Sequence, residues 1–147
     1  MRKLLVSVFV ALGLLASVTG VASAAGTATG PSTTATYDCR TVPKTSTVND
    51  GVPGPIFWAR MQCFGRGWGY TGPVDGVMGP NSWKAIQRYM DHNGWYDGPI
   101  DGNPGAETRK GLQRWATAKG GYTGPISGTT ERDAYKALAR VLNAMTF

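Results

Sequence analysis

Apolar side chains recur three positions apart in three segments of the chain, and this spacing predicts three amphipathic helices. The segments align without a gap as residues 83–89, 109–115 and 135–141. Clusters of glycine and proline separate them, so each helix is expected to follow a loop. The apolar faces are formed by Ile86 with Tyr89, Leu112 with Trp115, and Leu138 with Val141 and Leu142.

The loops repeat together with the helices. Residues 70–76 read Tyr-Thr-Gly-Pro-Val-Asp-Gly, and near copies follow at residues 96–102 and 122–128, a period of 26 residues. A degenerate copy lies upstream at residues 50–55, with a predicted helix at residues 56–64. Because a unit this short buries its apolar face against its neighbours, the sequence predicts an all-α fold, a small bundle of repeated loop-helix units.

Different residues mark the start of each predicted helix. Pro80 follows a glycine at a predicted first helical position, where the N–H that proline lacks would have no partner within the helix. Glu107 places an acidic side chain in the first turn of the next predicted helix. Thr130 and Asp133 have the spacing of a capping box. We therefore expect the third helix to begin with a side-chain cap.

The first 24 residues have the pattern of a secretory signal peptide. Arg2 and Lys3 precede an apolar run from Leu4 to Val18, and a small-residue site ends at Ala24. A membrane anchor is the alternative, but an anchor needs about 18 or more apolar residues without interruption. We expect cleavage after Ala24 and a secreted protein, extracellular or associated with the cell wall, with no membrane segment after cleavage.

Residues 25–49 are rich in threonine and serine and poor in aliphatic residues, which predicts an arm without a core of its own. Cys39 and Cys63 are the only cysteines, and in an exported chain a single pair is expected to form a disulfide. A catalytic thiol is the alternative, with His92 as the only histidine available as its base. The disulfide would tether the arm to one repeat-built domain, residues 50–147, in which residues 118–147 form an atypical last repeat.

The charge of the chain is mildly basic. Removal of Arg2 and Lys3 with the signal peptide lowers the formal net charge from +6 to +4. The cations are spread along the chain, which argues against nucleic acid as a partner and favours anionic surfaces. The acidic residues lack the spacing of a calcium loop, and histidine and cysteine do not cluster as in a zinc site, so we expect no cofactor.

Several short motifs between Phe57 and Trp115 occur in a fixed order: Met61-Gln62-Cys63-Phe64, Gly69-Tyr70, Asp75-Gly76-Val77-Met78-Gly79-Pro80, Ala85-Ile86-Gln87-Arg88-Tyr89, and Asp101-Gly102-Asn103-Pro104-Gly105-Ala106-Glu107-Thr108. This string resembles the peptidoglycan-binding domain 1 family. The resemblance implies a three-helix bundle that binds bacterial cell-wall peptidoglycan without catalysis, usually as an accessory to a wall-active enzyme.

The chain departs from that family pattern at two places. Asn81-Ser82-Trp83 stands where the family commonly has a threonine near the helix start. In the last copy, Ser127 and Glu131 replace the turn aspartate and glycine. The last repeat is therefore either a binding unit or a structural cap.

Asp75 and Asp101 lie one period apart and invite comparison with the carboxylate pair of a glycoside hydrolase. Both occupy an Asp-Gly turn, where an aspartate side chain accepts hydrogen bonds from nearby amides. We therefore interpret them as turn residues and predict that the protein is not an enzyme. A small wall hydrolase is the least favoured alternative, because the sequence offers no plausible catalytic set.

Each copy carries a lysine and an arginine four residues apart, an unfavourable spacing for like charges in a helix. The pairs are Lys84 with Arg88, Lys110 with Arg114, and Lys136 with Arg140. One interpretation is a solvated face with the arginines near helix C-termini. The other is a cationic strip that binds stem-peptide carboxylates or anionic wall polymers.

Aromatic residues divide into those that follow the period and those that do not. Tyr70, Tyr96 and Tyr122 recur at one position, which favours packing between repeats. Trp68 lies two residues before its repeated tyrosine, whereas Trp95 lies one residue before its own, so the two tryptophans do not follow the repeat. We predict that they bind ligand, because aromatic rings stack on sugar faces. Trp58, Trp83 and Trp115 fall on the apolar stripe and are expected in the core, and His92 is expected to be a surface residue at a helix end.

Taken with the resemblance, these observations predict a secreted, non-catalytic module that binds peptidoglycan, with Trp68, Trp95, Lys84, Arg88, Lys110 and Arg114 as candidate ligand-binding residues. A separate wall-active enzyme is a possible partner. The alternative function is a secreted protein-interaction or inhibitor protein that uses the same bundle as a scaffold.

Overall fold

The structure, a computed structural model, describes residues 35–147. The predicted signal peptide, residues 1–24, and the first part of the arm lie outside the described residues. The described part contains helices and no strand, which confirms the all-α prediction. The helices are α1 (Thr47–Asp50), α2 (Pro55–Arg66), α3 (Pro80–His92), α4 (Ala106–Gly120) and α5 (Arg132–Ala144).

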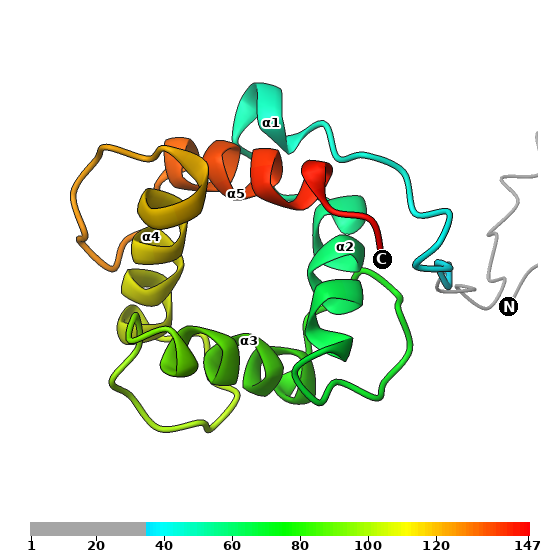
Figure 1. Cartoon of the computed structure of the whole chain (residues 1–147), viewed down its shortest axis with the longest axis horizontal. Helices are drawn as coiled ribbons and strands as arrows, with labels where there is room; N and C mark the ends of the chain where they lie inside the picture. The colour runs from blue at the N-terminus through cyan, green and yellow to red at the C-terminus, as the bar shows by residue number, and fades with distance from the viewer. Residues whose placement is uncertain (1–34) are drawn as a thin grey trace, which may run out of the picture. The chain divides into compact units, whose positions relative to one another are not determined.

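The four long helices follow one another around the sides of a square (Figure 1). Each long helix packs against the next, α5 also contacts α2, and the short helix α1 packs on α5. Three of them, α2, α3 and α4, cover the range for which the resemblance implied a three-helix bundle. The space they surround is filled by fully buried side chains, the largest of which are Phe57, Met61, Ile86, Met90, Trp115, Leu138 and Leu142.

Two of the three predicted helix starts are confirmed. Pro80 occupies the first turn of α3, and Glu107 lies in the first turn of α4. The capping box at Thr130 is wrong, because α5 begins after Glu131 and has no side-chain cap. The carboxylate of Glu131 instead accepts a hydrogen bond of 2.6 Å from the Thr129 hydroxyl, within the preceding turn.

A buried glutamine on each of α2, α3 and α4 holds the turn that precedes the following helix. For Gln87, Oε1 accepts a hydrogen bond of 2.8 Å from the Gly102 N–H. Its Nε2 donates to Asp101 Oδ1 at 3.0 Å and to the Asn103 carbonyl at 3.1 Å. Gln62 and Gln113 make the corresponding bonds to the turns at residues 75–77 and 127–129. Because all three amides are buried, each turn is fixed to the helix before it.

The loop tyrosines are part of the core, as predicted. Tyr70, Tyr96 and Tyr122 are all buried. Each phenol donates a hydrogen bond to the carbonyl of the proline three residues later. The glycine between them leaves room for the ring, since an added Cβ would lie within 3 Å of it. These tyrosines therefore shape the loops and are covered from solvent.

Residues before α2 close the circle of helices. Thr47 donates from its hydroxyl to the Val52 carbonyl at 3.0 Å, which is the bond that a glutamine makes in the other turns. The turn glycine Gly51 lies against the start of α5, where an added Cβ would be 2.4 Å from the Arg132 carbonyl oxygen. The last helix thus supports the first turn, and the helices form a closed set.

Hydrogen bonds from the buried side chain of Arg60 stabilise this closed arrangement of helices. Its guanidinium is almost fully buried and donates to the carbonyls of Leu142 and Met145 at the end of α5. It also donates to the Val42 carbonyl at 2.9 Å in the arm. Burial lowers the pKa of Arg60 from its ordinary value, yet an arginine with such a high ordinary value stays charged. The charge stabilises the C-terminus of α5, where carbonyl groups lack helical partners.

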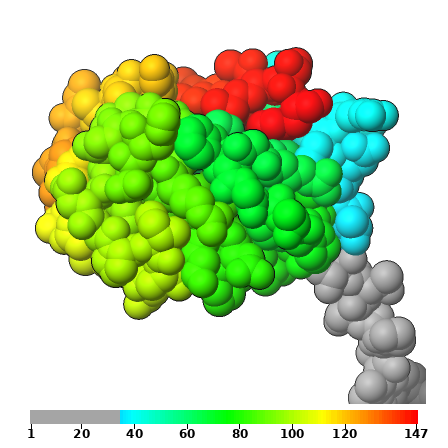
Figure 2. Space-filling view, turned by 60° about the horizontal axis from the view of Figure 1, so that its bottom comes forward, coloured from blue at the N-terminus to red at the C-terminus, as the bar shows by residue number. Residues whose placement is uncertain are grey.

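The predicted disulfide is confirmed. Cys39 and Cys63 are joined with a Cα–Cα distance of 5.5 Å, which ties the arm to the end of α2. The arm is also attached by a backbone hydrogen bond of 2.6 Å from Tyr37 to Val74. Figure 2 shows the described part of the arm, residues 35–49, in cyan beside the red C-terminal segment.

Candidate aromatic binding surface

Three half-buried aromatic side chains meet where α2 and α3 end. The ring centroid of Tyr89 lies 5.1 Å from that of Trp68 and 5.7 Å from that of Trp95, both in edge-to-face geometry. We call these three residues the aromatic surface cluster. His92 is exposed beside it, with its ring 5.2 Å from Trp68. The two tryptophans predicted as ligand residues therefore lie on one surface, joined by a tyrosine.

The cluster rests on a second layer of aromatic rings. Phe64 is 4.6 Å from Tyr89, and the fully buried Trp115 is 4.7 Å from Tyr89 and 5.1 Å from Phe64. The two contacts of Tyr89 are edge-to-face, whereas the Phe64 and Trp115 rings are tilted at 31°. Edge-to-face contacts fix ring orientation beyond what apolar burial provides. Partial burial raises the pKa of Tyr89 above its ordinary value, so its phenol stays neutral. The surface is thus rigid from below and open on its outer side.

Arginines of the repeated pairs fix the loops that carry the tryptophans. Arg88 donates to the Trp68 carbonyl at 3.2 Å, and Arg114 donates to the Trp95 carbonyl at 2.9 Å. Arg140 makes the same kind of bond to Gly120 at 2.7 Å. Neither interpretation of the charge pairs foresaw this contact, in which Arg88 and Arg114 reach back to the loop before their own helix and Arg140 reaches back to the last residue of α4. Since a guanidinium has five N–H donors, each arginine keeps donors for a ligand.

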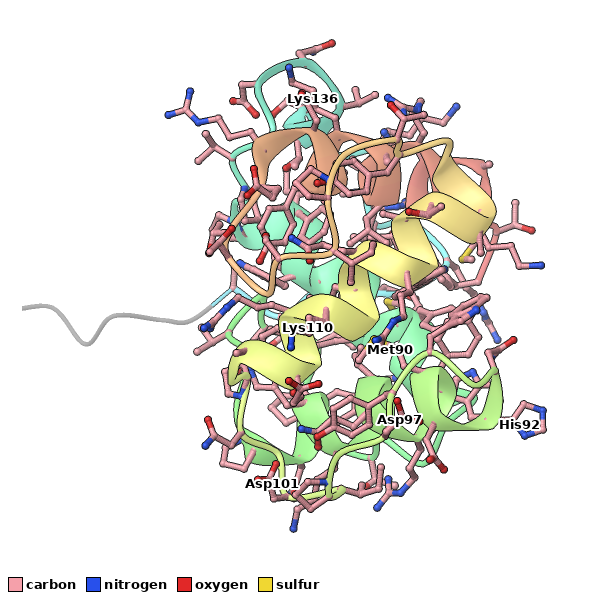
Figure 3. All side chains as sticks on the ribbon, turned by 90° about the vertical axis from the view of Figure 1, so that its left-hand side faces the viewer. Met90, His92, Asp97, Asp101, Lys110 and Lys136 are labelled. Carbon is pink, nitrogen blue, oxygen red and sulfur yellow. A yellow bond between two sulfur atoms is a disulfide. The ribbon has the colours of Figure 1, made fainter. Side chains whose placement is uncertain are left out.

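The lysines of the pairs lie apart from the cluster. Lys110 forms an ion pair with Glu107 at 2.8 Å, and Lys136 forms one with Asp133 at 3.2 Å. Figure 3 shows Lys110 well separated from His92, with Met90 between them. Lys84 lies one turn before Arg88. The pKa of Asp101 is lowered first by the hydrogen bonds from Asn103 and Gln87, and the charge of Lys84 adds only a small part. The structure therefore brings together Trp68, Trp95, Arg88 and Arg114, and leaves Lys84 and Lys110 outside that group.

Asp75 and Asp101 are turn residues, as interpreted from the sequence. Each accepts a hydrogen bond from the backbone N–H two residues later, at 2.9 Å for Val77 and 2.8 Å for Asn103. The side-chain bond from Gln62, followed by the backbone bond from Val77, lowers the pKa of Asp75. Both carboxylates are thus held ionised by the turn, with Oδ1 of each accepting two hydrogen bonds.

Tyr89 is the member of the cluster that sequence reasoning missed. Its position on the apolar stripe of α3 predicted a core residue, and it is half-buried instead. A usable signal was present, because Phe64, Tyr89 and Trp115 occupy one repeat position and are all aromatic. The last repeat has Val141 there, so the last repeat contributes no ring to this layer.

Two other kinds of feature are absent from residues 35–147, a metal-ligand cluster and a membrane-spanning helix. In this part of the chain, histidine, cysteine and acidic side chains do not gather in threes at a distance suited to a metal ion. Over the same residues, no helix has the length and apolar character needed to cross a membrane. Comparison of the chain with family models, curated proteins and solved structures finds no match.

Proposed function

We propose that this protein binds bacterial cell-wall peptidoglycan without catalysis, through the aromatic surface cluster. The observation that carries the proposal is the cluster itself, in which Trp68 and Trp95 flank Tyr89 and keep one side open to solvent. Sugar rings present apolar C–H faces that stack on such aromatic surfaces. The resemblance to the peptidoglycan-binding domain 1 family points to the same ligand.

Polar groups around the rings suit a glycan chain. Arg88 is exposed and bonded to the Trp68 carbonyl, and the exposed His92 ring lies 5.2 Å from the Trp68 ring. These side chains supply hydrogen-bond donors for hydroxyl and acyl oxygens of the sugars. The positive charge of Arg88 would also attract anionic wall polymers at low ionic strength. Export by the predicted signal peptide, residues 1–24, would bring the protein to the wall.

Cosedimentation with purified sacculi tests this proposal. The chain without residues 1–24 is expected to pellet with sacculi. Trp68→Ala and Trp95→Ala are each expected to weaken binding about fivefold, because an aromatic contact contributes about 1 kcal/mol. Trp58→Ala is the matched control, because Trp58 is also half-buried but packs against Phe57 and Trp83. Circular dichroism would establish that each variant is folded.

A salt series separates stacking from simple charge attraction. Binding through the cluster should persist at 0.5 M salt, where the Debye length falls to about 4–5 Å and exposed charges are largely screened. It should also persist on sacculi stripped of teichoic acid. Failure of the protein to pellet at low salt, or equal loss of binding in Trp68→Ala and Trp58→Ala, would refute the proposal.

A further inference from the structure

We infer that the protein has a second binding site, a groove between the arm, the end of α2 and the C-terminal segment, which takes the acidic stem peptide of the same wall polymer. This inference rests on the proposed function and adds a site to it. The groove has a volume of about 470 Å³, within the range of sites for small ligands. We call it the arm groove, and the argument uses Cys39, Arg40, Phe64, Arg66, Met145 and Phe147 from its lining.

The lining of the arm groove combines an apolar surface with two cations. Phe64, Met145 and Phe147 are half-buried and provide the apolar part, next to Cys39. Arg40 and Arg66 are exposed, and neither forms an ion pair with another residue of the described range 35–147. Such a site favours a short peptide with small apolar side chains and free carboxylates.

One acidic residue also borders the groove. Asp38 is exposed, and its Oδ1 accepts a hydrogen bond of 2.9 Å from the backbone N–H of Arg40. This bond satisfies part of the carboxylate within its own turn. Among the side chains of the lining, the two arginines outnumber Asp38, and this excess of positive side chains complements the carboxylates of a stem peptide.

The walls of the groove are held in place before any ligand arrives. The disulfide fixes Cys39 to α2, and the buried Arg60 donates to the Met145 carbonyl at 2.9 Å. The Arg60 guanidinium also lies 5.0 Å from the centre of the Phe147 ring, a cation–π contact. A preformed groove binds with a smaller ordering cost than a flexible one.

The arm groove is continuous with the aromatic surface cluster, which favours one ligand for both. Phe64 lines the groove and also packs against Tyr89 of the cluster. Gly67 lines the groove, and the next residue is Trp68. A glycan stacked on the cluster would therefore place the peptide branching from it near Arg66. We assign the glycan to the cluster and the peptide to the arm groove.

Separated wall components test this assignment. An amidase that cleaves the bond between sugar and peptide yields glycan strands and free stem peptides, and each is titrated against the protein by calorimetry. Arg40→Gln with Arg66→Gln is expected to weaken peptide binding about five- to tenfold, the effect of two exposed charge contacts, and to leave glycan binding unchanged. The matched control is Lys119→Gln with Arg132→Gln, which removes two exposed cations elsewhere.

The outcomes distinguish this inference from the proposed function. Peptide binding that is weakened by Arg66→Gln, more strongly by Arg66→Glu, and not by Trp68→Ala would support the arm groove. Equal peptide affinity in wild type and the Arg40/Arg66 variant, or no saturable peptide binding by wild type, would overturn it. Glycan binding retained in that case would leave the aromatic cluster intact as the wall-binding site. Peptide binding without glycan binding would support the groove and refute the cluster.

Discussion

Replacing Gln87 by leucine tests whether the buried glutamines hold the loops to the helices. Gln87 is fully buried, and its amide makes hydrogen bonds with three groups of the following turn and with the Thr108 hydroxyl at 3.1 Å. Leucine has nearly the same size and keeps the apolar contacts. The substitution therefore removes the hydrogen bonds with little change in packing.

The expected loss follows from the groups left without a partner. The Gly102 N–H is buried and loses its acceptor, at a cost of about 1–3 kcal/mol. The other bonds end on groups that keep a second partner, such as the Asn103 carbonyl, which also accepts from Thr108 at 2.9 Å. They add about 1 kcal/mol together. We expect Gln87→Leu to lower the free energy of unfolding by about 3 kcal/mol, or Tm by about 10–15 °C for a domain of this size.

Urea and thermal unfolding followed by circular dichroism measure this loss. Asn81→Leu is the control, because it makes a similar polar-to-leucine change at an exposed position of the same helix. It should change stability by less than about 0.5 kcal/mol. A Gln87→Leu variant as stable as this control would show that the glutamine bonds do not hold the fold together.

Two further predictions concern acid stability and the disulfide. The pKa of Asp75 is lowered in the folded state, first by the hydrogen bond from Gln62 and then by the bond from the Val77 N–H. The ionised carboxylate therefore stabilises the fold above the unfolded pKa near 4, and this stabilisation is lost as the pH falls through the pKa of the folded state. Urea unfolding between pH 2 and 6 should therefore show a weaker acid loss for Asp75→Asn, and an unchanged pH profile would contradict this. Replacing Cys39 and Cys63 by serine should cost about 3 kcal/mol in urea unfolding for a 24-residue separation; a loss below about 1 kcal/mol would show that the arm is held by its other contacts.

The helices and loops were predictable from the sequence because they depend on local signals. Spacing of apolar residues located α3, α4 and α5, and proline and glycine located the loops between them. The cap of α5 was predicted wrongly, because the side chain of Glu131 bonds within the turn and Thr130 is left exposed. Such competition between neighbouring polar groups is decided by loop geometry, which spacing alone does not contain.

The contacts that close the circle of helices depend on distant pairs and were not predictable. Arg60 replaces the small residues Ala85 and Gly111 of the other repeats, and its partners at Val42 and Leu142 lie far away in the sequence. The same holds for the candidate site. The phase of Trp68 suggested a ligand role, but its packing on Tyr89 follows only from the way the helices meet.

The indole N–H signals of the tryptophans, observed by NMR while glycan strands are added, test the central proposal most directly. Trp68 and Trp95 border the exposed cluster, whereas Trp83 and Trp115 are buried in the core. We expect the Trp68 and Trp95 signals to shift in a saturable way, with the Trp83 signal unchanged. Saturable glycan binding that leaves both cluster signals in place, or no binding at all, would contradict the proposal.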